Sequence, residues 1–391
     1  MIVPPQNACV KSGWQLWYSH LKNNTKDRLS QLQKQIMEEV KVPGTMENEL
    51  LMGEINQWHF YNASASIKTP TLLLHGYAAA SMGFHRNFAG LSSRIQNLYA
   101  IDLPANGLSP ESSQPLVVSC GKPLPMKAEF SKDRFKIPYT LEYLHQKSFI
   151  QQLEDYYLNS IEQWRIDNKL NKINIVAHSF GGYLSTKYAI KYPHAVERLC
   201  LVSPLGVERN IHSVNNHWCS NTWYDLNYED PGSKYYMRRM RDIPSTVFQS
   251  QVKLLRLLGP LGAKLCWNYI NAAYSRVKNE KYKEYVFELF YGKEGVTQTA
   301  MDIFTNLFTR QLLAKDPLMD SLQHLHVDRL MLAYGEHDWM NKYAGVIMAK
   351  EFNHLRRKSD AATYTVISSS GHNMFLDNPD EFNEKVINFL K

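Results

Sequence analysis

The sequence predicts an α/β fold, in which a mostly parallel central sheet is flanked by helices and interrupted by a helical insertion. Three observations predict it. Strand-like and helix-like runs alternate along much of the chain, as they do when helices connect parallel strands. The strand-like runs are short and apolar, as expected for strands buried on both faces. A largely helical stretch rich in aromatic residues breaks this order at residues 205–322.

The expected elements follow one another along the chain. Strands are expected at residues 71–75, 98–101, 173–176, 199–203, 329–334 and 363–367, and the clearest helices at 149–165, 182–192 and 381–390. Residues 104–147 carry proline, serine and charge with little periodicity, which indicates a long surface excursion. We therefore expect an N-terminal amphipathic, peripheral segment (1–54), a core in two parts (55–204 and 323–391), and a helical lid between them (205–322).

The composition is that of an ordinary folded protein, with 44% hydrophobic and 21% charged residues. The formal net charge of +7 suits phospholipid headgroups or an anionic membrane surface. No nucleic-acid-binding pattern accompanies the charge, so we expect no nucleic-acid partner. The five cysteines are scattered without a CxxC pair, which favours a reducing compartment over a disulfide framework or a zinc site. We expect no metal and no cofactor; the oligomeric state is left open.

Ser179 lies where an apolar strand in "INIVAHSFGGYLS" runs into a helix. A nucleophile elbow needs this context, because its serine adopts a strained backbone conformation at a sharp turn. Small residues two before and two after the serine avoid clashes across that turn, and Ala177 and Gly181 occupy these positions. In the alternative interpretation, Ser179 merely caps the helix.

A serine nucleophile needs a general base that is oriented by an acid. Asp338 follows a late strand in "RLMLAYGEHDWM", and His372 follows the next one in "TYTVISSSGHNMF". Both lie at the carboxyl ends of expected parallel strands, where such sites assemble, and the order Ser, Asp, His is the one that accompanies a nucleophile elbow. We predict a catalytic triad of Ser179, Asp338 and His372, with Glu336 as the weaker candidate for the acid.

The tetrahedral intermediate of acyl transfer needs backbone donors for its oxyanion. His75-Gly76-Tyr77 forms a tight turn after an early strand, so the N–H groups of Tyr77 and of Phe180, the residue after the nucleophile, are the candidate pair. The loop that begins at Asp102 in "LYAIDLPANGLS" is interpreted as structural.

Together these residues resemble the α/β-hydrolase superfamily over roughly residues 55–391. The matching motifs are H-G-Y, D-L-P-x-x-G-x-S, the serine elbow, G-x-x-D and a late G-H; Ala177 departs from the usual glycine. Within the superfamily, "AHSFGGY", "VSPLGVE", "GEHDWMNKYAG" and "GHNMFLDNP" resemble a lipid-active branch. That branch includes a lipid-droplet lipase coactivator, fungal cardiolipin-specific phospholipases and fungal lysophosphatidate acyltransferases, the last being the most similar.

The resemblance implies a phospholipid or lysophospholipid substrate. Acylation of lysophosphatidic acid to phosphatidic acid, with acyl-CoA as a substrate, is the first expectation. Phospholipase A activity is the alternative, and a non-catalytic lipase coactivator is the alternative of another class. The branch is also credited with an H-x4-D acyltransferase motif, matched here by His372 and Asp377. The preferred interpretation of Asp377 is as an N-terminal cap, a position that it or Asn378 could take, of the helix that follows.

Two surface features concern lipid binding. Trp14, Trp17, Tyr18 and Leu21 recur at helical spacing, and would form an apolar stripe suited to a bilayer or droplet surface, or to packing on the protein itself. In "KYYMRRMR", Arg238, Arg239 and Arg241 form either a phosphate-binding group or a solvated face of the lid. No apolar run is long enough to span a bilayer, and no signal peptide is evident. We expect an intracellular protein, cytosolic or peripheral on a membrane or lipid droplet, with a mitochondrial location left open.

Overall fold

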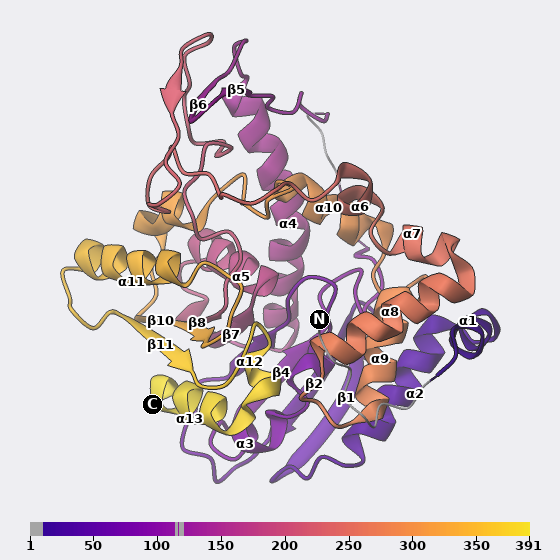
Figure 1. Ribbon diagram of the computed structural model, residues 1–391. Helices are drawn as coiled ribbons and strands as arrows, with labels where there is room; N and C mark the ends of the chain where they lie inside the picture. The colour runs from indigo at the N-terminus through magenta and orange to yellow at the C-terminus, as the bar shows by residue number, and fades with distance from the viewer. Residues whose placement is uncertain (1–10, 114–115, 117–120) are drawn as a thin grey trace.

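An eight-stranded sheet, in the order β1-β2-β4-β3-β7-β8-β10-β11, crosses the centre of the computed structural model, which describes residues 11–113, 116 and 121–391 (Figure 1). Its strands are β1 Thr45–Leu51, β2 Ile55–Tyr61, β3 Thr71–Leu74, β4 Asn97–Ile101, β7 Ile173–His178, β8 Val196–Val202, β10 Arg329–Gly335 and β11 Ala362–Ile367. The β1–β2 and β2–β4 pairs are antiparallel. From β4 to β11 the strands are parallel, so their carboxyl ends share one edge.

All of the predicted strands are present, and the structure adds β1 and β2. The strand β1 lies at the edge of the sheet, and most of its side chains are exposed. Its sequence, "TMENELL", therefore has no apolar run that would predict a strand. Because β1 begins at Thr45, the sheet starts before residue 55, where the sequence analysis placed the beginning of the core.

Helices cover both faces of the sheet. One face packs against α4 (Tyr143–Asp167), α5 (Phe180–Lys191) and α11 (Lys342–Arg356); the other packs against α3 (Phe88–Ser92), α12 (Met374–Asp377) and α13 (Pro379–Leu390). Each face of the sheet forms a separate hydrophobic core with the helices that cover it. In β3, Leu72 and Leu74 point into the core on the first face, and Leu73 points into the core on the second. Burial on both faces explains why the strands are continuous apolar runs.

The insertion is helical from Ser245 onwards. It contains α6 Ser245–Ser250, α7 Val252–Leu257, α8 Gly259–Ala273, α9 Glu280–Tyr291 and α10 Gln298–Leu307, followed by a 3-10 helix, Leu318–His324. Residues 205–244, all of which are described, contain no α-helix. Instead, β9 (Tyr224–Asp225) joins β5 (Glu129–Ser131) and β6 (Arg134–Lys136) of the predicted surface excursion in a three-stranded sheet. The excursion and the first part of the insertion thus fold together over a small core around Phe135 and Trp218.

The N-terminal helices α1 (Gly13–Lys22) and α2 (Thr25–Met37) lie beside α8 and α9 of the insertion (Figure 1). Ser12 caps α1 in a capping box with Gln15, and Glu284 of α9 pairs with Arg28 at 2.6 Å. The segment that the sequence analysis treated as peripheral is therefore docked on the insertion. Among the described residues, no helix combines the length and the apolar character needed to cross a membrane.

The aromatic stripe of α1 divides between two environments. Leu16 and His20 face the protein, and Trp17 packs partly against the core shared with α8. Trp14, Tyr18 and Leu21 are exposed by 68%, 56% and 54%. The exposed part of the stripe therefore does not pack on the protein's own surface.

Candidate active site

The candidate site lies at the carboxyl edge of the parallel strands. The loop after β3 carries Tyr77, and the turn after β7 carries Ser179. The loop after β10 carries Asp338, and the loop after β11 carries His372. Four segments that are far apart in the sequence meet here because the parallel strands all end at one edge.

Ser179 occupies a strained turn between β7 and α5. Its φ is +53° and its ψ is −115°, a conformation that costs a residue with a side chain roughly 1–3 kcal/mol. Its N–H donates to the Val202 carbonyl at 2.9 Å, which ties the turn to β8. The Ser179 hydroxyl makes no capping hydrogen bond to α5, whose residues are all described. The structure therefore does not support the helix-cap interpretation.

The turn at His75-Gly76-Tyr77 packs directly against Ser179. A Cβ atom at Gly76 would lie 3.0 Å from the Ser179 Cβ, and one at Gly181 would lie 2.4 Å from the His75 carbonyl oxygen. Glycine is required at position 181, where a Cβ would collide with backbone, and a Cβ at position 76 would crowd the Ser179 side chain. The backbone N–H groups of Tyr77 and Phe180 make no hydrogen bond to any residue that the structure describes. Both predicted oxyanion donors are therefore unpaired beside the serine.

Asp338 and His372 are hydrogen-bonded to each other. Oδ1 of Asp338 lies 3.2 Å from Nδ1 of His372, and the same oxygen accepts the Met340 N–H at 3.0 Å. Burial opposes ionisation of Asp338, but the hydrogen bonds from His372, Ser203 and Met340 outweigh it and lower the pKa of the carboxyl group. Asp338 is thus an ionised carboxylate that orients the His372 ring. Glu336, the weaker candidate, instead accepts the Ser369 N–H at 2.8 Å.

Ser203, at the end of β8, also contacts both Asp338 and His372. Its Oγ lies 2.5 Å from Oδ2 of Asp338 and 2.8 Å from Nδ1 of His372. Like Ser179 it has a positive φ, +48°. The sequence analysis assigned it no role. Its position at the carboxyl end of a predicted strand, the argument applied to Asp338, was the signal that could have found it.

Two further side chains hold the loop that carries His372. Nε2 of His178 lies 3.1 Å from the His372 carbonyl oxygen, and the two rings are 4.6 Å apart. Burial, with the nearby His372 ring, holds the pKa of His178 well below its usual range, so this neutral ring can donate to that carbonyl. Asp377 accepts the Gly371 N–H at 2.9 Å. Its carboxylate therefore fixes the residue before His372 and makes no cap on α13, which is fully described.

The three arginines considered as a phosphate-binding group or a solvated face lie in different surroundings. Arg238 is largely buried and forms an ion pair with Glu208. Arg239 is exposed and lies 3.6 Å from Glu229, and Arg241 is exposed. Because Arg238 already has a buried carboxylate partner, the structure leaves only Arg239 and Arg241 open to a ligand.

The loop at Asp102 has the structural role expected of it. Asp102 accepts the backbone N–H groups of Ser81 at 2.7 Å and Leu108 at 2.8 Å. The next residue, Leu103, donates its N–H to Nε2 of His75 at 2.8 Å. The loop thereby holds the turn that carries Tyr77.

Chemically, this arrangement suits nucleophilic acyl transfer. It brings a strained serine, a histidine oriented by a carboxylate and two unpaired N–H groups to one edge of the sheet. The reaction requires a nucleophile, a base, an acid and oxyanion donors, and these groups are of the types that can supply them.

Comparisons with known proteins agree with the architecture. A family model described as "alpha/beta hydrolase fold" matches residues 69–379. The chain is 57% identical to Protein ECM18 of Saccharomyces cerevisiae, over 98% of this chain and 85% of that protein. It is 45% identical to 1-acylglycerol-3-phosphate O-acyltransferase ICT1 of the same yeast, over 93% and 92%. Among solved structures, carboxylesterase CesB of Bacillus subtilis superposes with a TM-score of 0.53 at 14% identity, covering 94% of this chain and 98% of that one.

Proposed function

The chain belongs to the alpha/beta hydrolase fold family, as its motifs predicted, and from this premise we propose that it is a serine-dependent lipid acyltransferase. The proposed reaction moves an acyl group from acyl-CoA to lysophosphatidic acid and forms phosphatidic acid. The Ser179 turn beside the Asp338–His372 pair carries the chemistry. The likeness to ICT1 supports the choice of acceptor, because that protein is named as a 1-acylglycerol-3-phosphate O-acyltransferase.

In the first half of the proposed reaction, His372 removes the hydroxyl proton of Ser179 as Oγ attacks the thioester carbonyl. The N–H groups of Tyr77 and Phe180 stabilise the resulting oxyanion. Collapse of the intermediate expels the CoA thiolate, which takes the proton from His372 and leaves an acyl-serine. The positive charge on His372 is stabilised by the ionised Asp338.

In the second half, the hydroxyl of lysophosphatidic acid replaces the thiol. It loses its proton to His372 and attacks the acyl-serine carbonyl, and the Ser179 oxygen leaves and recovers that proton. If water attacks instead, the product is a fatty acid and the enzyme is a hydrolase. Transfer therefore requires that the lysophospholipid occupy the site before water reaches the acyl-serine.

Product analysis with purified protein tests the proposal. We expect labelled oleoyl-CoA and lysophosphatidic acid to give labelled phosphatidic acid, and Ser179→Ala to abolish its formation. Ser185→Ala removes a buried hydroxyl from the same helix and serves as the control. A parallel assay contains labelled intact phospholipids; release of fatty acid there, with no phosphatidic acid formed from oleoyl-CoA, would replace the proposal with a phospholipase. If neither product forms and a serine-reactive probe labels the wild type no better than Ser179→Ala, the protein is a non-catalytic coactivator.

A further inference from the structure

A cavity of about 1050 Å³ lies between the surface excursion, α4 and the insertion. Its walls come from residues 122–130, from the start of α4, from residues 212–214 and 242–249, and from residues 302–315. This volume is at the upper end of the range for sites that bind small molecules. The cavity could therefore hold much of a single-chain lipid.

The aromatic residues of the cavity wall belong to a cluster that packs against Phe180 and Tyr77. Phe308 lines the cavity, and its ring lies 5.8 Å from that of Phe180, the residue after Ser179. Phe248 also lines it and lies 6.4 Å from Phe304, whose ring stacks on Tyr77 at 3.8 Å. Both residues that carry the oxyanion donors thus contact the aromatic cluster that walls the cavity.

Another part of the cavity wall is basic, because Lys122, His212 and Lys315 line it. The Lys315 backbone is held beside this wall by the Val214 N–H, which donates to its carbonyl at 2.7 Å. Among the described residues, the ammonium groups of Lys122 and Lys315 have no carboxylate partner. Burial, together with the charge of Lys122, lowers the pKa of Lys315 to about 8. Burial, together with the charge of Lys315, lowers the pKa of His212 to about 4.

Two acidic residues line the cavity. Asp242 pairs with Arg310 at 2.5 Å, whereas Asp302 is exposed and accepts from the neutral amide of Gln298 at 2.6 Å. A phosphate would supply the negative charge that Lys315 and Lys122 lack. Burial and the neighbouring Lys122 charge both disfavour the charged form of Lys315, and a bound phosphate would favour it.

We propose that this cavity binds a phosphate-bearing acyl lipid, with its phosphate at Lys315 and Lys122 and its chain along the aromatic wall that packs against Phe180, the residue after Ser179. The inference rests on the proposed function, because it names the subsite that would hold one of the two substrates. The phosphate belongs either to lysophosphatidic acid or to the CoA part of acyl-CoA. It is recognised here and not by Arg238, whose guanidinium is paired with Glu208.

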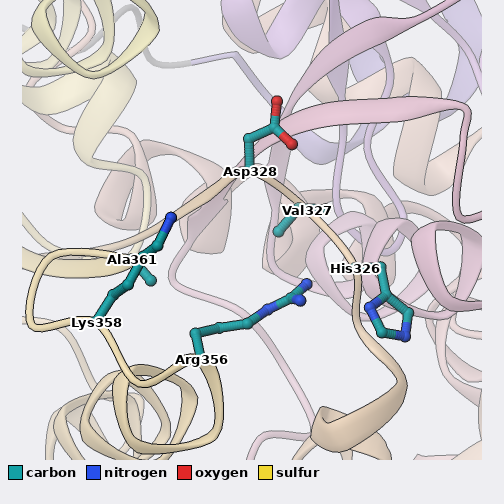
Figure 2. Close-up of a pocket in the computed structure, with 6 residues that line it drawn as sticks. All are labelled: His326, Val327, Asp328, Arg356, Lys358 and Ala361. Atoms are coloured by element: carbon teal, nitrogen blue, oxygen red, sulfur yellow. The ribbon is translucent and has the colours of Figure 1, made fainter.

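A smaller basic cavity, of about 320 Å³, does not share these features. Figure 2 shows Arg356 extending toward the segment that carries His326, Val327 and Asp328. Its guanidinium donates to the Leu325 carbonyl at 2.7 Å, and Asp328 lies 3.5 Å from Lys172. This cavity lies at the amino ends of β10 and β11, away from the edge that carries Ser179. Its Lys358 therefore makes a suitable control.

Binding to full-length protein tests the subsite without relying on turnover. The Ser179→Ala chain, which cannot form an acyl-serine, is titrated below the critical micelle concentration with oleoyl-lysophosphatidic acid, oleoyl-CoA and monooleoylglycerol. We expect Lys315→Gln and Lys122→Gln each to raise the Kd of a phosphate-bearing ligand roughly tenfold, since a charged hydrogen bond is lost. Monooleoylglycerol, which has no phosphate, should bind all variants equally, and Lys358→Gln should change nothing.

The pattern of loss identifies the phosphate. Weakened binding of lysophosphatidic acid alone assigns the subsite to the acceptor, and weakened binding of oleoyl-CoA alone assigns it to the donor. Unchanged Kd values for both ligands in the exposed Lys122→Gln and in Lys315→Gln overturn the inference. The two tests are independent. Unchanged Kd values would not contradict the role of Ser179 in catalysis, and a failed product assay would not contradict measured binding of the lipid.

Discussion

The Ser203 hydroxyl lies between the acid and the base of the candidate site, 2.5 Å from Oδ2 of Asp338 and 2.8 Å from Nδ1 of His372. It is closer to the histidine than the Asp338 carboxylate is, at 3.2 Å. The hydroxyl can donate to the carboxylate and accept from the imidazole at the same time. Ser203 is therefore a positioning residue that fixes the orientation of the Asp338 carboxylate relative to the His372 ring.

Replacing Ser203 should impair catalysis with little effect on substrate binding. We expect Ser203→Ala to lower kcat about tenfold with KM unchanged, the loss of about 1.4 kcal/mol that one hydrogen bond to a charged group can supply. Ser203→Gly relieves the strain of the positive φ and should lose the same activity, because the hydroxyl is again absent. Steady-state kinetics of both variants, with the exposed Ser368→Ala as a control, provide the measurement. Full kcat in Ser203→Ala would rule out the positioning role.

Asp377 should matter through the loop that it holds. Asp377→Asn keeps an oxygen that can accept the Gly371 N–H but removes the charge, whereas Asp377→Ala removes the hydrogen bond. We therefore expect kcat to fall further in Asp377→Ala than in Asp377→Asn, with transfer and hydrolysis reduced in the same proportion. The ratio of phosphatidic acid to fatty acid measures this. A selective loss of transfer in either variant would instead give Asp377 an acyltransferase-specific role.

The exposed face of α1 should bind lipid surfaces. Trp14, Tyr18 and Leu21 project from α1, and Leu257, just before the α8 helix that packs on α1, is 83% exposed. Inserting such side chains into the membrane interface contributes several kcal/mol in total, so we expect the triple alanine variant of α1 to bind anionic vesicles at least roughly tenfold more weakly. Leu144→Ala removes a leucine at the start of α4 that is 85% exposed, more than Leu21, and serves as the control in vesicle sedimentation. Equal sedimentation of wild type and triple variant would show that α1 is not a lipid-binding surface.

The lowered pKa of Asp338 predicts how stability depends on pH. A carboxyl group whose pKa is lower in the folded state stabilises the fold above its unfolded pKa of about 3.9, and that stability is lost as pH falls through the lower folded pKa. We therefore expect Asp338→Asn to lose less stability than the wild type between about pH 5 and pH 2. Denaturant unfolding across this range measures the difference. Parallel curves for the two proteins would mean that the Asp338 carboxyl has the same pKa folded and unfolded.

The parts of this molecule that were predictable from sequence are those with a local signal. The buried strands are apolar because they are covered on both faces, and the Ser179 turn requires small neighbours in a short segment. The strand β1 gave no such signal, because an edge strand with exposed side chains has no apolar pattern.

Other features depend on contacts between distant segments. Ser203 contacts Asp338 and His372 only because β8, β10 and β11 are neighbours in the sheet. Lys122 and Lys315 share a cavity because the excursion and the insertion fold together. No spacing along the chain encodes these contacts. Nor does the local arginine cluster reveal that Arg238 pairs with Glu208, thirty residues earlier in the chain.

The covalent intermediate tests the central claim most directly. The protein is mixed with oleoyl-CoA in the absence of an acceptor, quenched in acid, and examined by intact mass and by peptide mapping. We predict one oleoyl group on the peptide that contains Ser179, its absence in Ser179→Ala, and its loss when lysophosphatidic acid is added before the quench. An oleoyl group on another residue, or phosphatidic acid formed at the wild-type rate by Ser179→Ala, would contradict the assignment of Ser179 as the nucleophile.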